Sequence, residues 1–382
     1  MPELKIEKLV YGGDGMGFLE GKVCFVEGAL PGEKVAVEIF QDKKNFSRGR
    51  LVSILEPSPA RRAPECPYVA SCGGCQYQHL AYEEELRWKE NQVRDYFARE
   101  LKTDPGRVKA IRHAAKPYGY RNSVTLHAAR GGVPGFFGRD NESVVPVAEC
   151  LIADPALAPV FSRSIPQGEK NLSFRLSGAG EILSSADDRL FQVSLLGESF
   201  WTHSRSFFQN NLAVTEQLLT QARAWVDEAG PDTFMDLYAG SGLFALMAAP
   251  GVKSLVCAEE NPYSLQALEK NLEGRPASVV LAEGRVESFL HELWEKEAKG
   301  KTFVFLDPPR QGLAPEAADF FAHDFDGEAL VYLSCHMGTL LRDLKKFQAN
   351  PAYELKEVVP FDMFPRTKHI EVAAFFRRRK ES

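Results

Sequence analysis

The chain lacks any hydrophobic run of about 18 residues, so no part of it is expected to cross a membrane. Its N-terminal segment also lacks the basic start and the apolar core of a secretory signal. A general excess of positive charge is missing as well, because the formal net charge is -6. These absences predict a cytoplasmic protein without a membrane partner. They also confine any surface that meets phosphate groups to a local patch.

The seven cysteines are an odd number in a chain without a predicted secretory signal, which argues against a disulfide framework. Four of them are spaced as Cys-x5-Cys-x2-Cys with one distant member, and two glycines in this stretch let the chain wrap closely around a site. Four thiolates can hold either zinc or an iron–sulfur cluster, and the spacing leaves that choice open. The members of this set are Cys66, Cys72, Cys75 and Cys150.

The length of 382 residues exceeds what one compact domain usually holds, which predicts several domains. Residues 1–58 alternate short apolar stretches, such as 23–26 and 34–39, with glycines, a pattern typical of a small β-barrel. A proline-rich stretch ends that pattern. Residues 59–200 form a predicted central domain, which holds the cysteine set, a helix over 80–101 and short strands.

Residues 201–382 alternate helices with strands, which predicts an α/β fold with an open, doubly wound sheet. Such sheets bind ligands at the carboxyl ends of their strands, so polar residues that follow strands are candidates for a site. Helices are predicted at 211–229, 243–249 and 263–272, and strands at 233–237, 254–259, 278–281, 303–306, 329–333 and 372–376.

A glycine-containing loop at residues 236–242 lies between a predicted strand and a helix. Glu259 ends the next strand, nineteen residues beyond Gly240, where a carboxylate can accept hydrogen bonds from ribose hydroxyls. The loop lacks the full Gly-x-Gly-x-x-Gly of dinucleotide enzymes and the Lys-Ser/Thr ending of a phosphate loop. A nucleoside cofactor without phosphates, such as S-adenosylmethionine, therefore fits better.

Three further polar residues stand at the ends of predicted strands. Asp307 begins a stiff Asp-Pro-Pro-Arg segment, Cys335 follows a strand, and Glu371 opens one. Taken singly, a cysteine is more often a small buried hydrophobe, and a glutamate at a strand end is more often solvated. The alternative interpretation is that Cys335 is a nucleophile and Glu371 a general base at the edge of the sheet.

Four segments resemble the motifs of the RNA 5-methyluridine methyltransferases, in the order in which that family has them. They are residues 207–211, 307–313, 332–344 and 362–371. The resemblance implies a Rossmann-like domain that converts a uridine of RNA to 5-methyluridine with S-adenosylmethionine as the methyl donor.

The same resemblance implies a role for each site residue. Cys335 would add to C6 of the uracil, and Glu371 would remove the C5 proton. Such a thiol needs thiolate character from nearby cations or hydrogen-bond donors. The expected contacts of the cofactor are Gln209, Tyr238, Glu259 and Asp307.

Two departures from the family pattern concern binding details rather than the chemistry. Family members often carry Asn-Pro after the cysteine, where this chain has His336-Met337. Leu243 stands where some relatives carry a polar cofactor contact. Neither change touches the expected nucleophile or base.

The N-terminal half extends the resemblance. Residues 12–57 resemble a TRAM domain, an OB-like RNA-binding module, and residues 41–62 carry a local charge balance of +4 that suits phosphates. The tail at 377–380 is a second basic candidate. Many family members share the cysteine pattern, which favours a [4Fe–4S] cluster with a structural or RNA-shaping role in a small central domain.

Two other classes of function are alternatives. A radical enzyme would use a cluster to cleave S-adenosylmethionine, but its cysteines are usually spaced Cys-x3-Cys-x2-Cys on a barrel of strands. A non-catalytic RNA-binding protein would have no use for both Cys335 and Glu371. Within the favoured class, 23S ribosomal RNA is the expected substrate, transfer RNA is the alternative, and the protein is expected to act as a monomer.

Overall fold

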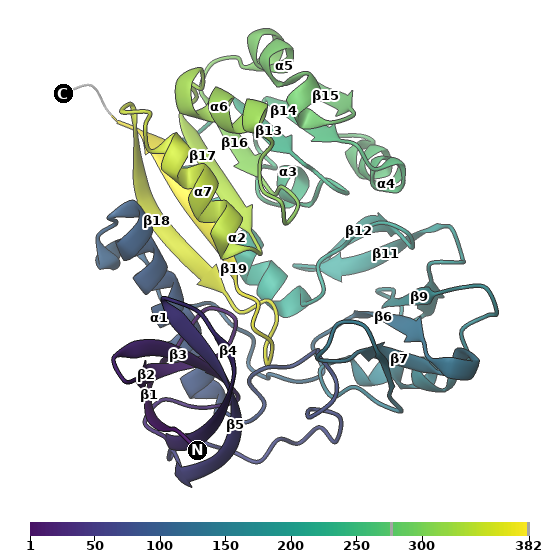
Figure 1. Cartoon of the computed structure of the whole chain (residues 1–382). Coiled ribbons are helices and arrows are strands. Elements are labelled where there is room, and N and C mark those ends of the chain that lie inside the picture. The colour runs from purple at the N-terminus through teal and green to yellow at the C-terminus, as the bar shows by residue number, and fades with distance from the viewer. Residues whose placement is uncertain (276–277, 380–382) are drawn as a thin grey trace.

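The first five strands close into a barrel, drawn in purple at the lower left of Figure 1. The structure is a computed structural model and describes residues 1–275 and 278–379. Burial alternates along the first strand, so that Leu4 and Ile6 point into the barrel beside Val26 and Val35. The predicted small β-barrel is confirmed. Its strands, in the order β1-β2-β3-β5-β4, are β1 (Glu3–Leu9), β2 (Gly15–Leu19), β3 (Lys22–Glu27), β5 (Phe46–Glu56) and β4 (Lys34–Asp42).

A buried ion pair ties the barrel to the segment that follows it. Glu33 has no solvent exposure and accepts hydrogen bonds from the backbone N–H of Leu30 at 2.8 Å and from Nη2 of Arg61 at 2.8 Å. Burial by itself would raise the pKa of Glu33, but Arg61 and the backbone amides hold it below its ordinary value. Arg61 is therefore engaged within the protein, which corrects its place in the predicted RNA-binding patch.

The basic C-terminal tail also has structural partners. Arg377 pairs with Glu228 at 2.8 Å and with Glu328 at 2.7 Å, and Arg379 donates to the backbone oxygen of Pro351 at 3.1 Å. Lys380, the last residue of that predicted patch, lies outside the described residues. The described arginines of the tail thus pair with other segments of the C-terminal domain.

The central part of the chain forms a five-stranded antiparallel sheet, at the lower right of Figure 1. A 3-10 helix, η3 (Pro155–Ser162), packs on it through Leu157, Val160 and Phe161, which share a core with Val124. The sheet has the order β10-β9-β6-β7-β8, with β10 (Ile182–Ser184), β9 (Asn171–Leu176), β6 (Ser123–Ala128), β7 (Pro134–Phe137) and β8 (Val144–Pro146).

The C-terminal part forms a seven-stranded sheet with helices on both faces, as predicted for a doubly wound domain. Five strands are parallel, and β19 runs antiparallel between β17 and β18. The order is β15 (Ser278–Glu283), β14 (Ser254–Glu259), β13 (Thr233–Leu237), β16 (Thr302–Leu306), β17 (Ala329–Ser334), β19 (Glu371–Arg378) and β18 (Tyr353–Phe361).

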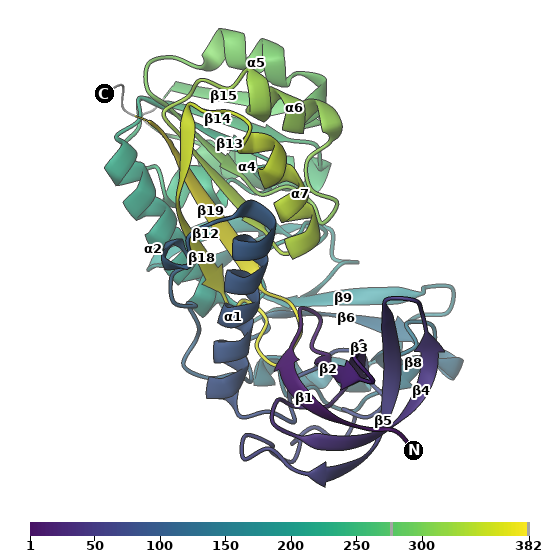
Figure 2. The ribbon, with the colours of Figure 1, turned by 60° about the vertical axis from the view of Figure 1, so that its left-hand side comes forward.

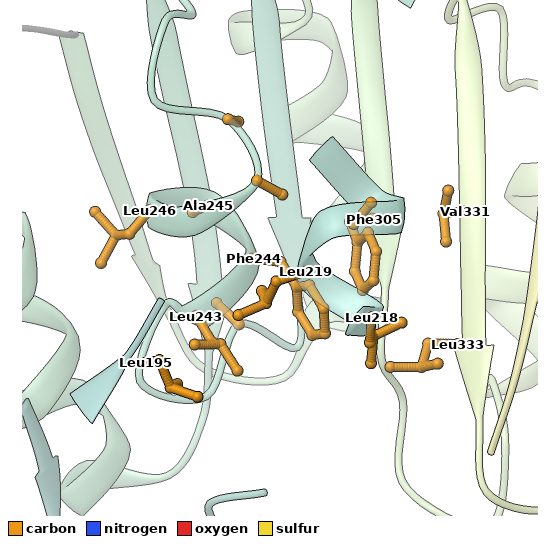
Figure 3. Close-up of a cluster of buried hydrophobic side chains, with 14 of the residues drawn as sticks. Leu195, Leu218, Leu219, Leu243, Phe244, Ala245, Leu246, Phe305, Val331 and Leu333 are labelled. Atoms are coloured by element: carbon orange, nitrogen blue, oxygen red, sulfur yellow. The ribbon is translucent and has the colours of Figure 1, made fainter. Parts of the chain in front are cut away.

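Two apolar layers cover this sheet. On one face α2 and α3 pack on the strands, and Figure 3 shows Leu218, Leu219 and Phe244 against Phe305 and Val331. The opposite face carries the other core cluster, to which α1, α6 and α7 contribute. Among the described residues, no helix combines the length and apolarity needed to span a membrane. The helices are α1 (Tyr82–Leu101), α2 (Leu212–Ala229), α3 (Leu243–Met247), α4 (Pro262–Leu272), α5 (Leu290–Glu297), α6 (Pro315–His323) and α7 (Met337–Phe347).

The helix α1 packs on the seven-stranded sheet although it precedes the central sheet in sequence. Val93 and Phe97 share a core with residues of α7 and β18, and Figure 2 shows α1 running beside both elements. The hairpin of β11 (Leu190–Leu195) and β12 (Glu198–His203) also packs on this domain, against α4. The predicted boundary at residue 200 therefore falls within β12.

A buried ion network joins α1 to the loop that leads into β19. Lys89 has no solvent exposure, and its Nζ lies 2.8 Å from Glu85 and 2.6 Å from Asp362. The backbone N–H of Arg366 also donates to Glu85 at 2.7 Å. Because an unpaired buried charge is costly, these contacts hold residues 362–366 firmly against α1. That loop ends at Glu371, so the network reaches the candidate site.

Candidate active site

A cavity of about 1030 Å³ lies at the carboxyl ends of the parallel strands. Arg121, at the start of the central sheet, lines its rim together with Phe207. The volume is large enough for a nucleoside cofactor and a base together. The structure brings all six residues expected for catalysis or cofactor binding to this cavity: Gln209, Tyr238, Glu259, Asp307, Cys335 and Glu371.

The strand order accounts for the cofactor half of the cavity. The parallel strands β14, β13 and β16 are neighbours, and Leu237 of β13 pairs with Ala258 on one side and Leu306 on the other. Tyr238, Glu259 and Asp307 end or directly follow these strands, so they converge on one edge of the sheet. Gln209 reaches the same cavity from the segment between β12 and α2.

Antiparallel pairing brings Cys335 and Glu371 together. Ser334, the last residue of β17, pairs with Val372 of β19. One step further along both strands, Cys335 therefore faces Glu371, although 36 positions separate them in the chain (371 minus 335). Glu371 is 5% exposed, so the candidate base is shielded from water beside the candidate nucleophile.

Burial sets the protonation of this pair. Burial raises the pKa of Cys335 to about 11, with a further contribution from the charge of Glu371. Burial and the charge of Asp307 raise the pKa of Glu371 to about 8. Arg310 opposes both shifts, because its positive charge favours the thiolate of Cys335 and the carboxylate of Glu371. The free protein thus keeps Cys335 as a thiol, and the expected cationic help from Arg310 only reduces the shift.

The cofactor half of the cavity is acidic. Burial, together with the charge of Glu259, raises the pKa of Asp307 to about 7. Glu259 accepts hydrogen bonds from the backbone N–H of Gly240 at 2.8 Å and of Asn261 at 2.7 Å. A carboxylate has about four acceptor sites, so it can still bind ribose hydroxyls. Close carboxylates of this kind favour a cationic ligand, which fits the sulfonium of S-adenosylmethionine.

The glycine loop is shaped for close approach of a ligand. Tyr238 has a φ of 68°, an uncommon conformation for a residue other than glycine that often marks functional sites. Gly242 has a φ of 83°, and a Cβ there would lie 2.4 Å from Leu268. Asp236, which opens the loop, is fully buried and accepts from the N–H of Ala245 at 2.9 Å. Leu243 lines the cavity as an apolar residue.

The departure at residues 336–337 has a structural explanation. His336 occupies the N-cap of α7, and its Nδ1 accepts a hydrogen bond from the backbone N–H of Thr339 at 3.2 Å. An asparagine at this position would supply the same kind of acceptor. Met337 is the first residue of the helix and keeps an N–H that a proline would lack.

Three cavity residues were not assigned a role from the sequence. Arg310 appeared there only as part of the Asp-Pro-Pro-Arg segment, and its action on Cys335 depends on the folded loop. Arg121 comes from a segment without a recognisable motif. Phe207 lines the cavity and is 65% exposed, and its place in the segment 207–211, which resembles a family motif, was the available signal.

Three cysteines of the set, Cys66, Cys72 and Cys75, lie in the loop between β5 and α1, and Cys150 follows β8 of the central sheet. Cys72 pairs with Gly138 in an isolated bridge, and its Sγ accepts from the N–H of Gly74 at 3.4 Å. The hydroxyl of Tyr68 accepts from the N–H of Ala148, which ties this loop to the segment of Cys150. Within the described ranges, no group of three or more His, Cys, Asp or Glu side chains is placed to hold a metal ion.

Two family models match the chain in different regions. The model described as tRNA (Uracil-5-)-methyltransferase matches residues 198–379, and the TRAM domain model matches residues 3–52. An RNA methyltransferase of Bdellovibrio bacteriovorus is 31% identical, and the alignment covers 98% of this chain and 94% of that protein. The chain belongs to the RNA (uracil-5-)-methyltransferase family.

Membership confirms the predicted class of enzyme, an RNA methyltransferase that depends on S-adenosylmethionine. The TRAM assignment of the barrel is confirmed as well. A second relative is the 23S rRNA (uracil(1939)-C(5))-methyltransferase of Mannheimia succiniciproducens. It is 28% identical, and the alignment covers 98% of this chain and 96% of that protein.

A solved structure extends the likeness to the whole fold of this methyltransferase. The tRNA (uracil-54, C5)-methyltransferase of Pyrococcus abyssi, in complex with S-adenosyl-L-homocysteine, superposes with a TM-score of 0.73. The sequences are 20% identical, and the match covers 98% of this chain and 100% of that one. This similarity confirms a methyltransferase fold that carries an N-terminal barrel.

Proposed function

We propose that this methyltransferase forms 5-methyluridine in RNA through a covalent bond between Cys335 and the uracil. C5 of uracil is too weak a nucleophile to take a methyl group unaided. When the sulfur of Cys335 bonds to C6 and its proton passes to water, the electron pair of the C5–C6 double bond moves onto C5 and O4. S-adenosylmethionine, when bound, supplies the electrophilic methyl group that C5 then takes.

Glu371 would complete the reaction as the general base. Its carboxylate takes the proton from C5, the released electron pair restores the C5–C6 double bond, and the thiolate of Cys335 leaves. Arg310 stabilises negative charge on the sulfur before addition and after release. Gln209, Tyr238, Glu259 and Asp307 would hold the cofactor in the acidic half of the cavity.

The observation that carries this proposal is the pairing of β17 with β19, which sets a buried carboxylate opposite a cysteine in one cavity. A uridine reaches that cavity only after it leaves its stack, which favours loops or flipped bases. The exposed ring of Phe207 at the rim can stack on a base that has been displaced in this way.

Release of tritium from RNA labelled at C5 of uridine tests the proposal. Each methyl transfer to C5 should release one C5 hydrogen, so tritium should appear in water at the same rate as methyl groups appear in RNA. Cellular RNA made without this protein serves as substrate, and digestion to nucleosides identifies the product. Methyl transfer without tritium release would show that another atom is methylated and would overturn the proposal.

The choice of RNA substrate is supported by the named specificities of two similar proteins. We favour large-subunit ribosomal RNA, because the Mannheimia succiniciproducens relative that spans nearly the whole chain bears that specificity in its name. Transfer RNA is the second candidate, because the Pyrococcus abyssi enzyme whose structure matches the whole fold bears that specificity in its name. Mapping 5-methyluridine in both RNA classes from cells with and without the gene separates the two.

A [4Fe–4S] cluster held by Cys66, Cys72, Cys75 and Cys150 is proposed for the central domain. Two features of the loop suit it. The N–H bond from Gly74 to Cys72 is of the kind that supports cluster sulfurs. A Cβ on Gly73 would lie 2.7 Å from the backbone oxygen of Gly138, so this close wrapping requires glycine. Its role would be structural, because methyl transfer from a sulfonium moves no unpaired electron.

Anaerobic purification tests the cluster. Iron and acid-labile sulfide are expected in equal amounts, about four of each per chain, with the broad visible absorbance of a cluster. Cys72→Ser should lose most of both, whereas Cys24→Ser, in the barrel core, should keep them. Stoichiometric zinc without sulfide, or neither metal, would contradict the proposal.

A further inference from the structure

The turn between β1 and β2 brings the RNA-binding barrel against the nucleophile loop. Tyr11 lies in this turn, and its hydroxyl oxygen is 3.5 Å from the backbone nitrogen of Met337, two residues after Cys335. Its ring meets His336 edge to face, with 6.5 Å between the ring centroids, and meets Tyr96 of α1 at 6.0 Å. An aromatic residue of one domain therefore touches the loop that carries the nucleophile of another.

Hydrogen bonds fix this turn against α1. The backbone oxygen of Val10 accepts a hydrogen bond from Nε2 of Gln92 at 3.2 Å, and the same nitrogen donates to the hydroxyl of Tyr77 at 3.1 Å. Gly13 closes the turn by donating to Val10 at 3.0 Å. Because α1 packs on α7, the turn is held at the N-terminus of α7 through α1.

The helix α7 needs acceptors at its N-terminus, because its first backbone N–H groups have none within the helix. His336 satisfies Thr339, and the side chain of Met337 is buried. An N–H left without a partner in such surroundings is costly. The hydroxyl of Tyr11 is the acceptor placed for Met337. Cys335 lies two residues before Met337 and four before Thr339, so both caps constrain the backbone that carries it.

We propose that Tyr11 is a positioning residue, which holds Cys335 in line for addition to C6 and couples the seating of the barrel to that addition. The proposal rests on the nucleophilic role proposed for Cys335. The separation of 3.5 Å is long for an N–H···O bond. A small movement of the barrel when RNA binds would therefore strengthen the contact or break it, and the sulfur would follow.

The variant Tyr11→Phe keeps the ring and removes only the hydroxyl. We expect kcat for methyl transfer to fall by about threefold to tenfold, the range of one modest hydrogen bond, with KM for RNA within about twofold of wild type. Tyr96→Phe is the matched control, because its ring adjoins Tyr11 while its hydroxyl faces Arg99, and it should keep the wild-type kcat. A structural role for Tyr11 would instead change KM for RNA or the melting temperature.

Alkylation by iodoacetamide, followed by peptide mass spectrometry, gives a readout that does not require catalysis. Loss of the cap loosens the loop, so Cys335 in Tyr11→Phe should react about threefold to tenfold faster at fixed pH. Cys24 and Cys257 are fully buried and should stay protected, which excludes general unfolding. Faster alkylation with slower methyl transfer is the signature of a displaced sulfur. The groups that set the protonation of Cys335 are Glu371, Arg310 and Asp307, all unchanged in this variant.

Met337→Pro removes the N–H group that donates to the hydroxyl of Tyr11, at a helix position that tolerates proline. Whatever that change costs by itself, Tyr11→Phe should cause no further loss of kcat in its background. The proposal would be overturned if the double variant lost kcat by the product of the two single losses. It would also be overturned if Tyr11→Phe alone kept the wild-type kcat and the wild-type rate of Cys335 alkylation. If RNA gains no 5-methyluridine yet Tyr11→Phe still accelerates alkylation, the proposed function fails while the positioning role stands.

Discussion

Replacement of Cys335 by alanine is expected to lower the rate of uridine methylation by at least about 10⁴-fold, the scale on which loss of a covalent nucleophile acts. Without addition at C6, C5 has no electron density to offer the methyl donor, and no neighbouring group in the cavity can replace a thiolate. Methyl incorporation into RNA is the measurement. RNA that contains 5-fluorouridine provides a second one, because fluorine at C5 cannot leave as a proton and the adduct with wild-type protein should persist.

Two controls separate this effect from damage to the fold. Cys335→Ala should bind S-adenosylmethionine with wild-type affinity, because Cys335 is not among the residues expected to hold the cofactor. Cys257→Ala removes a fully buried thiol from β14 and should retain activity within about twofold. A Cys335→Ala protein that still methylates uridine, or a wild-type protein that forms no adduct with its cognate 5-fluorouridine RNA, would disprove covalent catalysis by this residue.

Replacement of Glu371 by glutamine is expected to block the second half of the reaction and to trap protein on ordinary uridine RNA. Addition and methyl transfer can proceed, but the amide cannot take the C5 proton, so turnover should fall by about 10²- to 10⁴-fold. A methylated RNA–protein adduct should accumulate, and denaturing gel electrophoresis detects it. Glutamine has nearly the same shape, so the packing around residue 371 in the cavity should be retained.

The pH dependence of the wild type carries the same information. Burial and Asp307 raise the pKa of Glu371 to about 8, so the carboxyl is protonated below that pH and is a base only above it. The resolution of the adduct should therefore speed up as pH rises towards about 8 and level off beyond it. Glu371→Gln should lose this dependence.

The control for this variant is Glu283→Gln, an exposed change at the end of β15 on the same edge of the sheet, which should behave as wild type. Rapid turnover by Glu371→Gln would exclude Glu371 as the base. Absence of both adduct and methylation would instead place its action before methyl transfer.

Much of the fold was predictable because its signals are local. The glycine and proline punctuation before residue 58 marked short strands that can only bury their apolar faces by closing on one another, and they form the barrel. The helix predicted at 211–229 is present, and Asn211 is its N-cap, with its side chain accepting from the N–H of Val214. Apolar runs such as 303–306 became central parallel strands, since both of their faces are covered.

Other elements escaped prediction because their causes are not local. The strand β18 has a run of half-buried residues followed by a run of buried ones, so it lacks the two-residue period of a strand, and its place at the edge of the sheet depends on β19. Lys89 looks like a surface cation within a charged helix, yet it is fully buried because Asp362 meets it from 273 positions away.

For the site, the sequence by itself determined which residue types stand at strand ends, the order of the motifs and the resemblance that joins Cys335 to Glu371. These are properties of neighbouring residues, which the chain carries whether or not it is folded. Only the tertiary structure decided that an antiparallel strand sets Glu371 opposite Cys335 and that Tyr11 of the barrel reaches Met337. It also decided that both reactive groups are protonated in the free protein, because register, domain contact and burial arise only when distant segments exclude water together.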